Sequence, residues 1–155
     1  MKIREGHKED LPRVLELIRE LAEFENAPEQ VTLSLEMFQE DGFGTDPVYG
    51  FFVAENEKGI LGMALFYYRY STWKGKTLFL EDIIVTLDER GKGIGKALFE
   101  RVINKAKEEN CQRMSWQVLD WNEPAIKFYK KYDAYLDDAW VNCDLYKEQI
   151  DNFNT

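Results

Sequence analysis

The chain has 155 residues, of which 45% are hydrophobic and 32% charged, so it can bury one core beneath a polar surface. Its formal net charge of −9 argues against nucleic acid or an anionic membrane surface as a partner, because both need basic patches. There is no apolar run of about 18 residues, and the N-terminus lacks a signal-peptide pattern. We therefore expect no membrane span and a cytoplasmic protein.

The two cysteines, Cys111 and Cys143, provide neither a disulfide framework nor metal-ligand spacing. This pattern favours two reduced thiols in a cytoplasmic chain that uses no metal. No repeat, low-complexity stretch or linker interrupts the sequence, so we expect a single domain over residues 1–155.

The first half of the chain predicts two helices and four strands. Apolar residues at helical spacing predict an amphipathic helix over residues 9–24. A loop follows, and Ser34 is the expected N-cap of a short helix over residues 34–41. Strands are expected over residues 2–5, 48–55, 60–70 and 77–86, and the last three read as an antiparallel meander.

The second half predicts a helix over residues 94–109 and then a strand over 113–119, which returns to the sheet parallel to the strand at 77–86. Asn122 is the expected N-cap of a helix over 123–132, and one or two strands are expected within 135–146. This order predicts an α/β (α+β) fold, with a mixed central sheet of about six to seven strands and flanking helices.

A glycine-rich turn connects the strand at 77–86 to the following helix. Gly91, Gly93 and Gly95 lie where the backbone N–H groups of the first helical turn are exposed at the positive end of the helix dipole. Such a turn forms an anion site, usually for phosphate. The sequence therefore places a phosphate-bearing ligand at this helix start.

Two common phosphate motifs do not fit this turn. A P-loop needs a glycine where Arg90 stands and a hydroxyl where Ala97 stands. A dinucleotide fingerprint needs a third glycine where Lys96 stands, in a unit that does not follow an antiparallel meander. The remaining pattern is Arg90-x-x-Gly93-x-Gly95, with a strand before it and a helix after it.

That pattern, with the order of elements around it, resembles the pyrophosphate loop of the GNAT superfamily of N-acetyltransferases, which bind acetyl-coenzyme A (acetyl-CoA). Nearly the whole chain resembles the spermidine/spermine N-acetyltransferase branch, and the segment from Ser71 to Gly75 looks more like its thialysine acetyltransferase subgroup. Asp133 departs from the glycine common in the family. The segments that carry the resemblance to the branch are residues 22–25, 41–44, 70–75, 80–82 and 120–130.

The resemblance implies a GNAT fold, acetyl-CoA as co-substrate, a small cationic amine as the acceptor, and a homodimer. It also implies that backbone groups hold the pantetheine arm and the pyrophosphate, and that an asparagine and a tyrosine contact the coenzyme. The implied cofactor-binding residues are Ile83, Ile84, Val85, Arg90, Gly91, Lys92, Gly93, Ile94, Gly95, Lys96, Asn122 and Tyr129.

Acetyl transfer needs a neutral amine, yet a lysine-like amine is neutral in fewer than about one molecule in 10³ at pH 7. The resemblance implies that Glu81 binds or deprotonates the amine, through water, and that Asp82 helps to bind the cation. In a regular strand these neighbouring side chains leave opposite faces, so they can act together on one face only if a bulge intervenes. The alternative reading is a pair of strand carboxylates that are neutralised by lysines.

Three further residues are substrate-binding candidates. Glu25 and Glu29 resemble family positions that line the amine site, although solvated loop charges would look the same in sequence. Trp73 is a candidate for substrate contact, with packing as its alternative.

Tyr129 is the candidate general acid that protonates the leaving thiolate, and Glu81 is the other catalytic candidate. Tyr129 lies two helical turns beyond Asn122, and its alternative is a core tyrosine. Asn122 already has a structural role if it caps its helix.

Three hypotheses about function remain open at this point. The first is direct acetyl transfer, within a ternary complex, to a thialysine-like amine or to a diamine or polyamine. The second is transfer to a protein N-terminus or lysine, and the third is a non-catalytic acetyl-CoA sensor. No serine or cysteine stands as an acyl-carrying nucleophile beside His7, the only histidine.

Overall fold

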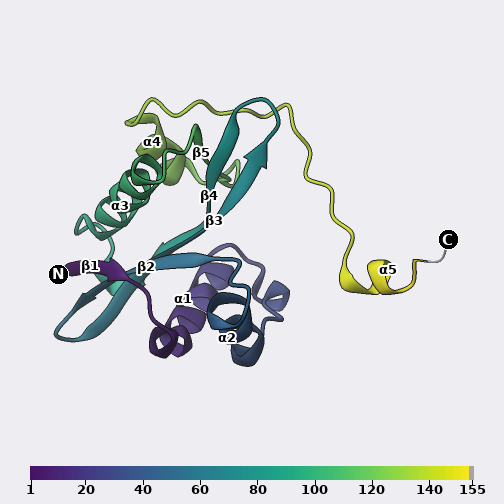
Figure 1. Cartoon of the computed structure of the whole chain (residues 1–155). Coiled ribbons are helices and arrows are strands. Elements are labelled where there is room, and N and C mark those ends of the chain that lie inside the picture. Colours follow the sequence, from purple (N-terminus) through teal and green to yellow (C-terminus); the bar gives the residue numbers. More distant parts are fainter. Residues whose placement is uncertain (154–155) are drawn as a thin grey trace. The chain divides into compact units, whose positions relative to one another are not determined.

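The computed structural model describes residues 1–153, and its centre is a five-stranded mixed sheet (Figure 1). The strands follow one another across the sheet in chain order, antiparallel up to β4, and β4 pairs with β5 in parallel. The predicted meander and parallel return are confirmed. The bounds are β1 Lys2–Glu5, β2 Gly50–Asn56, β3 Gly59–Ser71, β4 Gly75–Val85 and β5 Arg113–Trp116.

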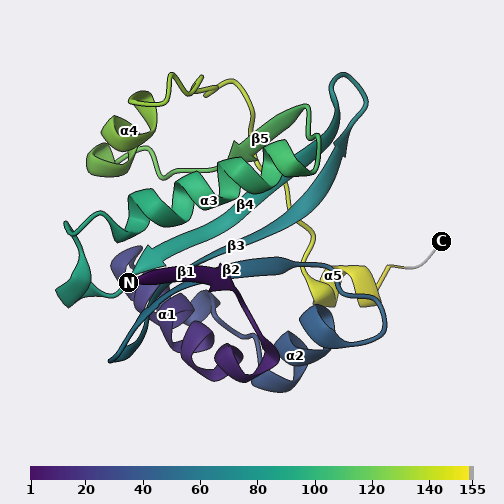
Figure 2. The same ribbon diagram turned by 60° about the vertical axis from the view of Figure 1, so that its left-hand side comes forward.

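Helices cover both faces of this sheet. Helices α1 (Leu11–Phe24) and α2 (Leu35–Phe43) lie on one face, and α3 (Ile94–Glu108) lies on the other (Figure 2). Ser34 caps α2 as expected, because its Oγ accepts a hydrogen bond from the backbone N–H of Met37 at 3.1 Å. Helix α1 begins two residues later than predicted, because residues 8–10 form a 3₁₀ turn.

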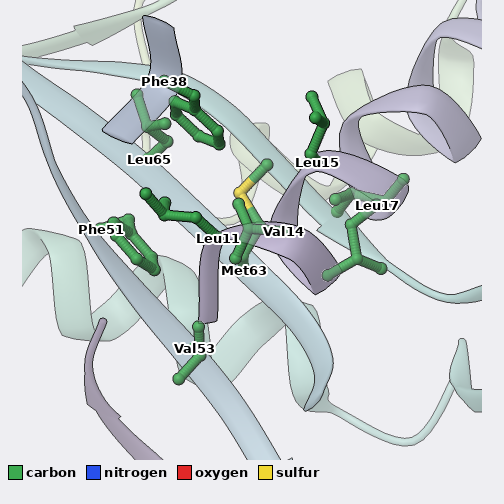
Figure 3. Close-up of a cluster of buried hydrophobic side chains, with 10 residues drawn as sticks. Leu11, Val14, Leu15, Leu17, Phe38, Phe51, Val53, Met63 and Leu65 are labelled. Carbon is green, nitrogen blue, oxygen red and sulfur yellow. The ribbon is translucent and has the colours of Figure 1, made fainter. Parts of the chain in front are cut away.

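The core on the α1 face joins α1 to the strands through apolar side chains (Figure 3). Leu11, Val14 and Leu17 have no exposed surface, so the apolar stripe of α1 is fully used in packing. Met63 and Leu65 of β3 meet this stripe from the sheet. Burial of these side chains fixes which residues of β3 face α1, and it thereby orients the neighbouring residues of β4.

Residues 1–117 form one compact unit, and the chain from Val118 onward forms a second. The second unit contains α4 (Glu123–Lys130) and α5 (Lys147–Asp151). The strands expected within residues 135–146 are absent from the described part of the chain, so the sheet has five strands and the predicted count of about six to seven was wrong.

The reason for this error is that β-prone residues form a strand only where a partner strand accepts their backbone hydrogen bonds. The 135–146 segment contains such residues, but its backbone joins no ladder in the described residues. Tyr135, Trp140 and Val141 are 88%, 77% and 85% exposed.

No helix within residues 1–153 combines the length and apolar character needed to cross a membrane.

Candidate functional site

A β-bulge interrupts the pairing of β3 with β4 at the two adjacent carboxylates. Leu65 pairs with Asp82, whereas Phe66 pairs with Leu80, so Glu81 is the extra residue on β4. A bulge of this kind shifts the alternation of side chains by one position. The regular strand assumed in the sequence-based argument is therefore not what forms here.

The bulge brings Glu81 and Asp82 to the same face of the sheet. Residues directly opposite each other in an antiparallel pair point to one face, and Leu65 packs in the α1 core, so Asp82 faces α1. Leu80 pairs with Phe66, whose ring stacks on Phe52 beneath α3, so the next residue, Glu81, also faces α1.

A third carboxylate, that of Glu25, interacts electrostatically with Asp82. Glu25 is the C-cap residue of α1, where burial raises the pKa of its carboxyl. The pKa of Asp82 is raised to about 7, first by burial, then by the negative charge of Glu81, and then by that of Glu25. The negative charges of Glu81 and Glu25 thus act on Asp82, and a cation bound nearby would lower the pKa of Asp82 again.

Tyr67 completes this group and was not predicted from the sequence. It lies on β3 opposite Phe79, with the two ring centroids 5.3 Å apart. Burial and the neighbouring Glu81 carboxylate raise the pKa of Tyr67. Its alternation with Leu65 placed it on the α1 face, but only the bulge brings Glu81 to it.

The structure places Trp73 away from these carboxylates and places Glu29 in an exposed turn. Glu29 lies in the 3₁₀ turn Pro28–Gln30. Trp73 lies in the β3–β4 turn and is 86% exposed. Gly75, which ends that turn, precedes Glu81 by six positions on β4, and this corresponds to about 20 Å of strand.

Beyond the bulge, one edge of β4 has no partner strand within the described residues. The parallel ladder with β5 ends at the Leu80–Trp116 pair, while β4 continues to Val85. Backbone groups of a strand point alternately to its two edges, so part of the Ile83–Val85 backbone faces the side that β5 has left. This arrangement suits an extended amide-bearing ligand such as the pantetheine arm.

The glycine-rich turn after β4 leads into helix α3, as expected, and two of its glycines have positive φ. Gly91 and Gly93 have φ of +76° and +81°, a region that residues with a Cβ rarely enter. Gly93 is the N-cap of α3, so the N–H groups of the first helical turn are available to an anion. Gly95 is helical, and a Cβ there would make only an ordinary contact at 3.7 Å with Val85, so the fold does not require this glycine.

Helix α1 holds this turn in place through two contacts one helical turn apart. The Thr86 hydroxyl donates a hydrogen bond to the Glu20 carboxylate at 2.9 Å. The Arg90 guanidinium lies 4.9 Å from the centroid of the Phe24 ring, and its Nε donates to the Val85 carbonyl at 2.9 Å. The Arg90 side chain thus braces the turn, while its backbone remains part of the anion site.

Asn122 and Tyr129 lie in the second unit. Asn122 caps α4 as expected, with its Oδ1 accepting from the Ala125 N–H at 3.3 Å. Tyr129 is only 7% exposed, and burial raises its pKa to about 12. A phenol with that pKa stays protonated at neutral pH, as a general acid must.

Within residues 1–153, no group of histidine, cysteine or carboxylate side chains is arranged to hold a metal ion. Along β4 and the turn that follows it, the first unit thus combines a helix start with an N-cap glycine, a strand edge left by β5, and the carboxylates of Glu81 and Asp82 on one face.

Comparison with known proteins identifies the family. The acetyltransferase (GNAT) family pattern matches residues 11–134. Thialysine N-epsilon-acetyltransferase of Bos taurus is 41% identical over 140 residues, covering 85% of this chain and 82% of that protein. Human spermidine/spermine N(1)-acetyltransferase-like protein 1 is 35% identical over 96% of this chain, which spans 23% of that longer protein.

A solved structure supports the same fold. An aminoglycoside acetyltransferase from a soil metagenomic sample superposes with a TM-score of 0.75 at 20% identity, covering 94% of this chain and 95% of that one. At that identity the likeness concerns the fold alone. The family match and the 41% identity go further, and together they show that this chain belongs to the GNAT family and is an acetyltransferase.

Proposed function

We propose that this enzyme transfers the acetyl group of acetyl-CoA to a primary amine of a small cationic substrate, thialysine-like or a diamine or polyamine. The observation that carries the proposal is the bulge at Glu81, which gathers Glu81 and Asp82 on one face beside Glu25. A cationic amine would relieve the repulsion among these carboxylates. The names of the bovine and human relatives, which refer to thialysine and to spermidine and spermine, agree with such a substrate.

The proposed cofactor site is the turn after β4 together with the open edge of β4. The backbone N–H groups from Arg90 to Lys96 would hold the pyrophosphate, and the backbone of Ile83–Val85 would hold the pantetheine arm. Gly95 supports this assignment, because the fold itself has room for a Cβ there and a close ligand explains the glycine. Acetyl-CoA, the co-substrate of GNAT acetyltransferases, supplies the thioester.

The proposed chemistry assigns one task to each side chain. Asp82 attracts the ammonium group, and Glu81, directly or through water, accepts the proton that the amine must lose. Tyr129 donates its phenolic proton to the leaving thiolate, with Asn122 as a further contact to the coenzyme. The amine attacks the thioester directly in a ternary complex, the C–S bond breaks, and no acetyl-enzyme intermediate forms.

Release of free thiol from acetyl-CoA tests this proposal with a panel of thialysine, diamines, spermidine and peptides. We expect a small amine to give the highest kcat/KM. A peptide that outcompetes every small amine would instead support protein acetylation. Tight acetyl-CoA binding without turnover of any acceptor would support a sensor.

A single domain over residues 1–155, a homodimer and a cytoplasmic location complete the proposal. The absence of strands in the 135–146 segment and its exposed aromatic residues are compatible with pairing between subunits. Light scattering coupled to size-exclusion chromatography tests the dimer, and a monomeric mass would contradict it.

A further inference from the structure

A cation stands on the same face of the sheet as the carboxylate group. Arg69 lies on β3 two residues after Tyr67, so both side chains face α1's side of the sheet. The Arg69 guanidinium lies 4.7 Å from the centroid of the Phe79 ring. Phe79 is buried and contacts Tyr67, so the ring provides a fixed platform beneath the guanidinium.

Tyr67 connects this cation to the carboxylates. The phenol senses Glu81, which raises its pKa, and Arg69, which lowers it. One row of contacting residues therefore runs from a positive end at Arg69, across Phe79 and Tyr67, to a negative end at Glu81 and Asp82.

The guanidinium is available to a ligand. Arg69 is exposed, and no carboxylate within residues 1–153 pairs with it at ion-pair distance. Its position over the Phe79 ring is a cation–π contact, which neutralises none of its positive charge. A planar guanidinium held in this way suits a carboxylate, which it can bind through two parallel hydrogen bonds.

The spacing of the two ends matches a particular class of molecule. Glu81 follows Phe79 by two positions on β4, which is about 7 Å along a strand. An extended α,ω-diamino acid of lysine length places its carboxylate and its terminal amine about 7 Å apart, given bonds of about 1.5 Å. The order of charges fits such a molecule, and its length is comparable to the spacing of Phe79 and Glu81 along the strand.

We propose that Arg69 is a specificity-determining residue that binds the α-carboxylate of a diamino-acid substrate whose terminal amine lies at Glu81 and Asp82. This inference rests on the proposed function and narrows its substrate class. A simple diamine or polyamine would bring a second ammonium group towards Arg69 and be repelled. The preference for diamino acids over diamines would therefore depend on a residue of β3 that lies outside the protein's own carboxylates, Glu25, Glu81 and Asp82.

The test compares thialysine with bis(2-aminoethyl) sulfide, which differs from it only by lacking the carboxylate. Release of free thiol gives kcat/KM for each amine with the wild-type enzyme and with Arg69→Gln. We expect the wild type to prefer thialysine, and Arg69→Gln to lower kcat/KM for thialysine on the order of 10- to 100-fold, mainly through KM. For the diamine, kcat/KM should rise, because a repelling charge is removed.

Two further variants control for charge and folding. Lys74→Gln removes the same charge from the nearby β3–β4 turn and should keep the wild-type ratio of the two kcat/KM values. Arg69→Lys retains the charge and should restore part of the preference. Equal use of both amines by the wild type, or a ratio unchanged in Arg69→Gln, would overturn the role of Arg69 while leaving amine acetylation intact. Failure to acetylate either amine would overturn the proposed function, and this inference with it.

Discussion

Asp82→Asn is a direct test of the carboxylate group, because it removes the most strongly perturbed charge and keeps the shape of the side chain. The pKa of Asp82 is about 7 in the folded protein, against 3.8 for an unperturbed aspartate. Between these values the folded protein binds a proton that the unfolded chain has lost, so stability falls as pH rises through this window. Above about pH 7 the full penalty for the buried charge is present.

The size of this penalty follows from the difference in pKa. About three pKa units at 1.36 kcal/mol each correspond to ~4 kcal/mol at pH 8, with Asp82 fully ionised in both states. At pH 5 the same linkage leaves a penalty of about 1–2 kcal/mol. Asparagine carries no charge, so the free energy of unfolding of Asp82→Asn should exceed that of the wild type by an amount that grows about 2–3 kcal/mol from pH 5 to pH 8.

Urea unfolding of both proteins at pH 5, 6.5 and 8 measures this difference, in the absence of acetyl-CoA and amines. Asp88→Asn is the matched control, since Asp88 is exposed after β4 and its substitution should change stability equally at each pH. If Asp82→Asn and the wild type lose stability in parallel from pH 5 to pH 8, the Asp82 carboxyl does not have the raised pKa described here. If Asp82→Asn is more stable than the wild type but has lower acetyltransferase activity, this is the pattern expected of a residue kept for function.

The remaining predictions address the chemistry and the backbone. Tyr129→Phe should lower kcat on the order of 10²-fold with KM nearly unchanged, and an unchanged kcat would remove Tyr129 from the role of acid. Glu81→Gln should lower kcat/KM for the amine on the order of 10²-fold, whereas the exposed-turn control Glu57→Gln should not; equal effects would point to general charge rather than to the site. Gly95→Ala should fold normally yet raise KM for acetyl-CoA at least about tenfold, whereas Gly93→Ala, at φ +81°, should also lose about 1–2 kcal/mol of stability; calorimetry and kinetics separate the two. Gly62→Ala places a Cβ 2.6 Å from the Ile84 carbonyl oxygen and should cost about 1–3 kcal/mol in urea unfolding; a neutral effect would contradict the close approach of β3 and β4 there.

Sequence patterns predicted those features of the structure that depend only on residues close together in the sequence. The caps at Ser34 and Asn122 follow from local chemistry that any short segment carries. The same holds for the helices, whose apolar spacing repeats within one segment. The positive φ angles at Gly91 and Gly93 were not predicted, although glycine is the residue that adopts them most readily. The family resemblance also rested on contiguous motifs, and the comparison confirmed it.

The C-terminal segment shows where such reasoning fails. Residues 135–146 have the composition of strands, but a strand is completed by hydrogen bonds to another segment, and composition cannot show whether that partner is present. The described residues contain no such ladder there, and Trp140 is exposed instead of packed. The prediction of about six to seven strands was too high because it assumed that every β-prone segment pairs with another strand.

The sequence by itself determined the order of elements up to α4, the glycine-rich turn and the presence of two adjacent carboxylates on one strand. Only the tertiary structure decided that Glu81 and Asp82 share a face, because the bulge is a mismatch of register between β3 and β4. That mismatch also brings Tyr67 to Glu81, and the pairing of β3 with β4 stacks Arg69 on Phe79. Register is set by long-range packing against α1, so the arrangement of charge at this site is a property of the fold that no local pattern contains.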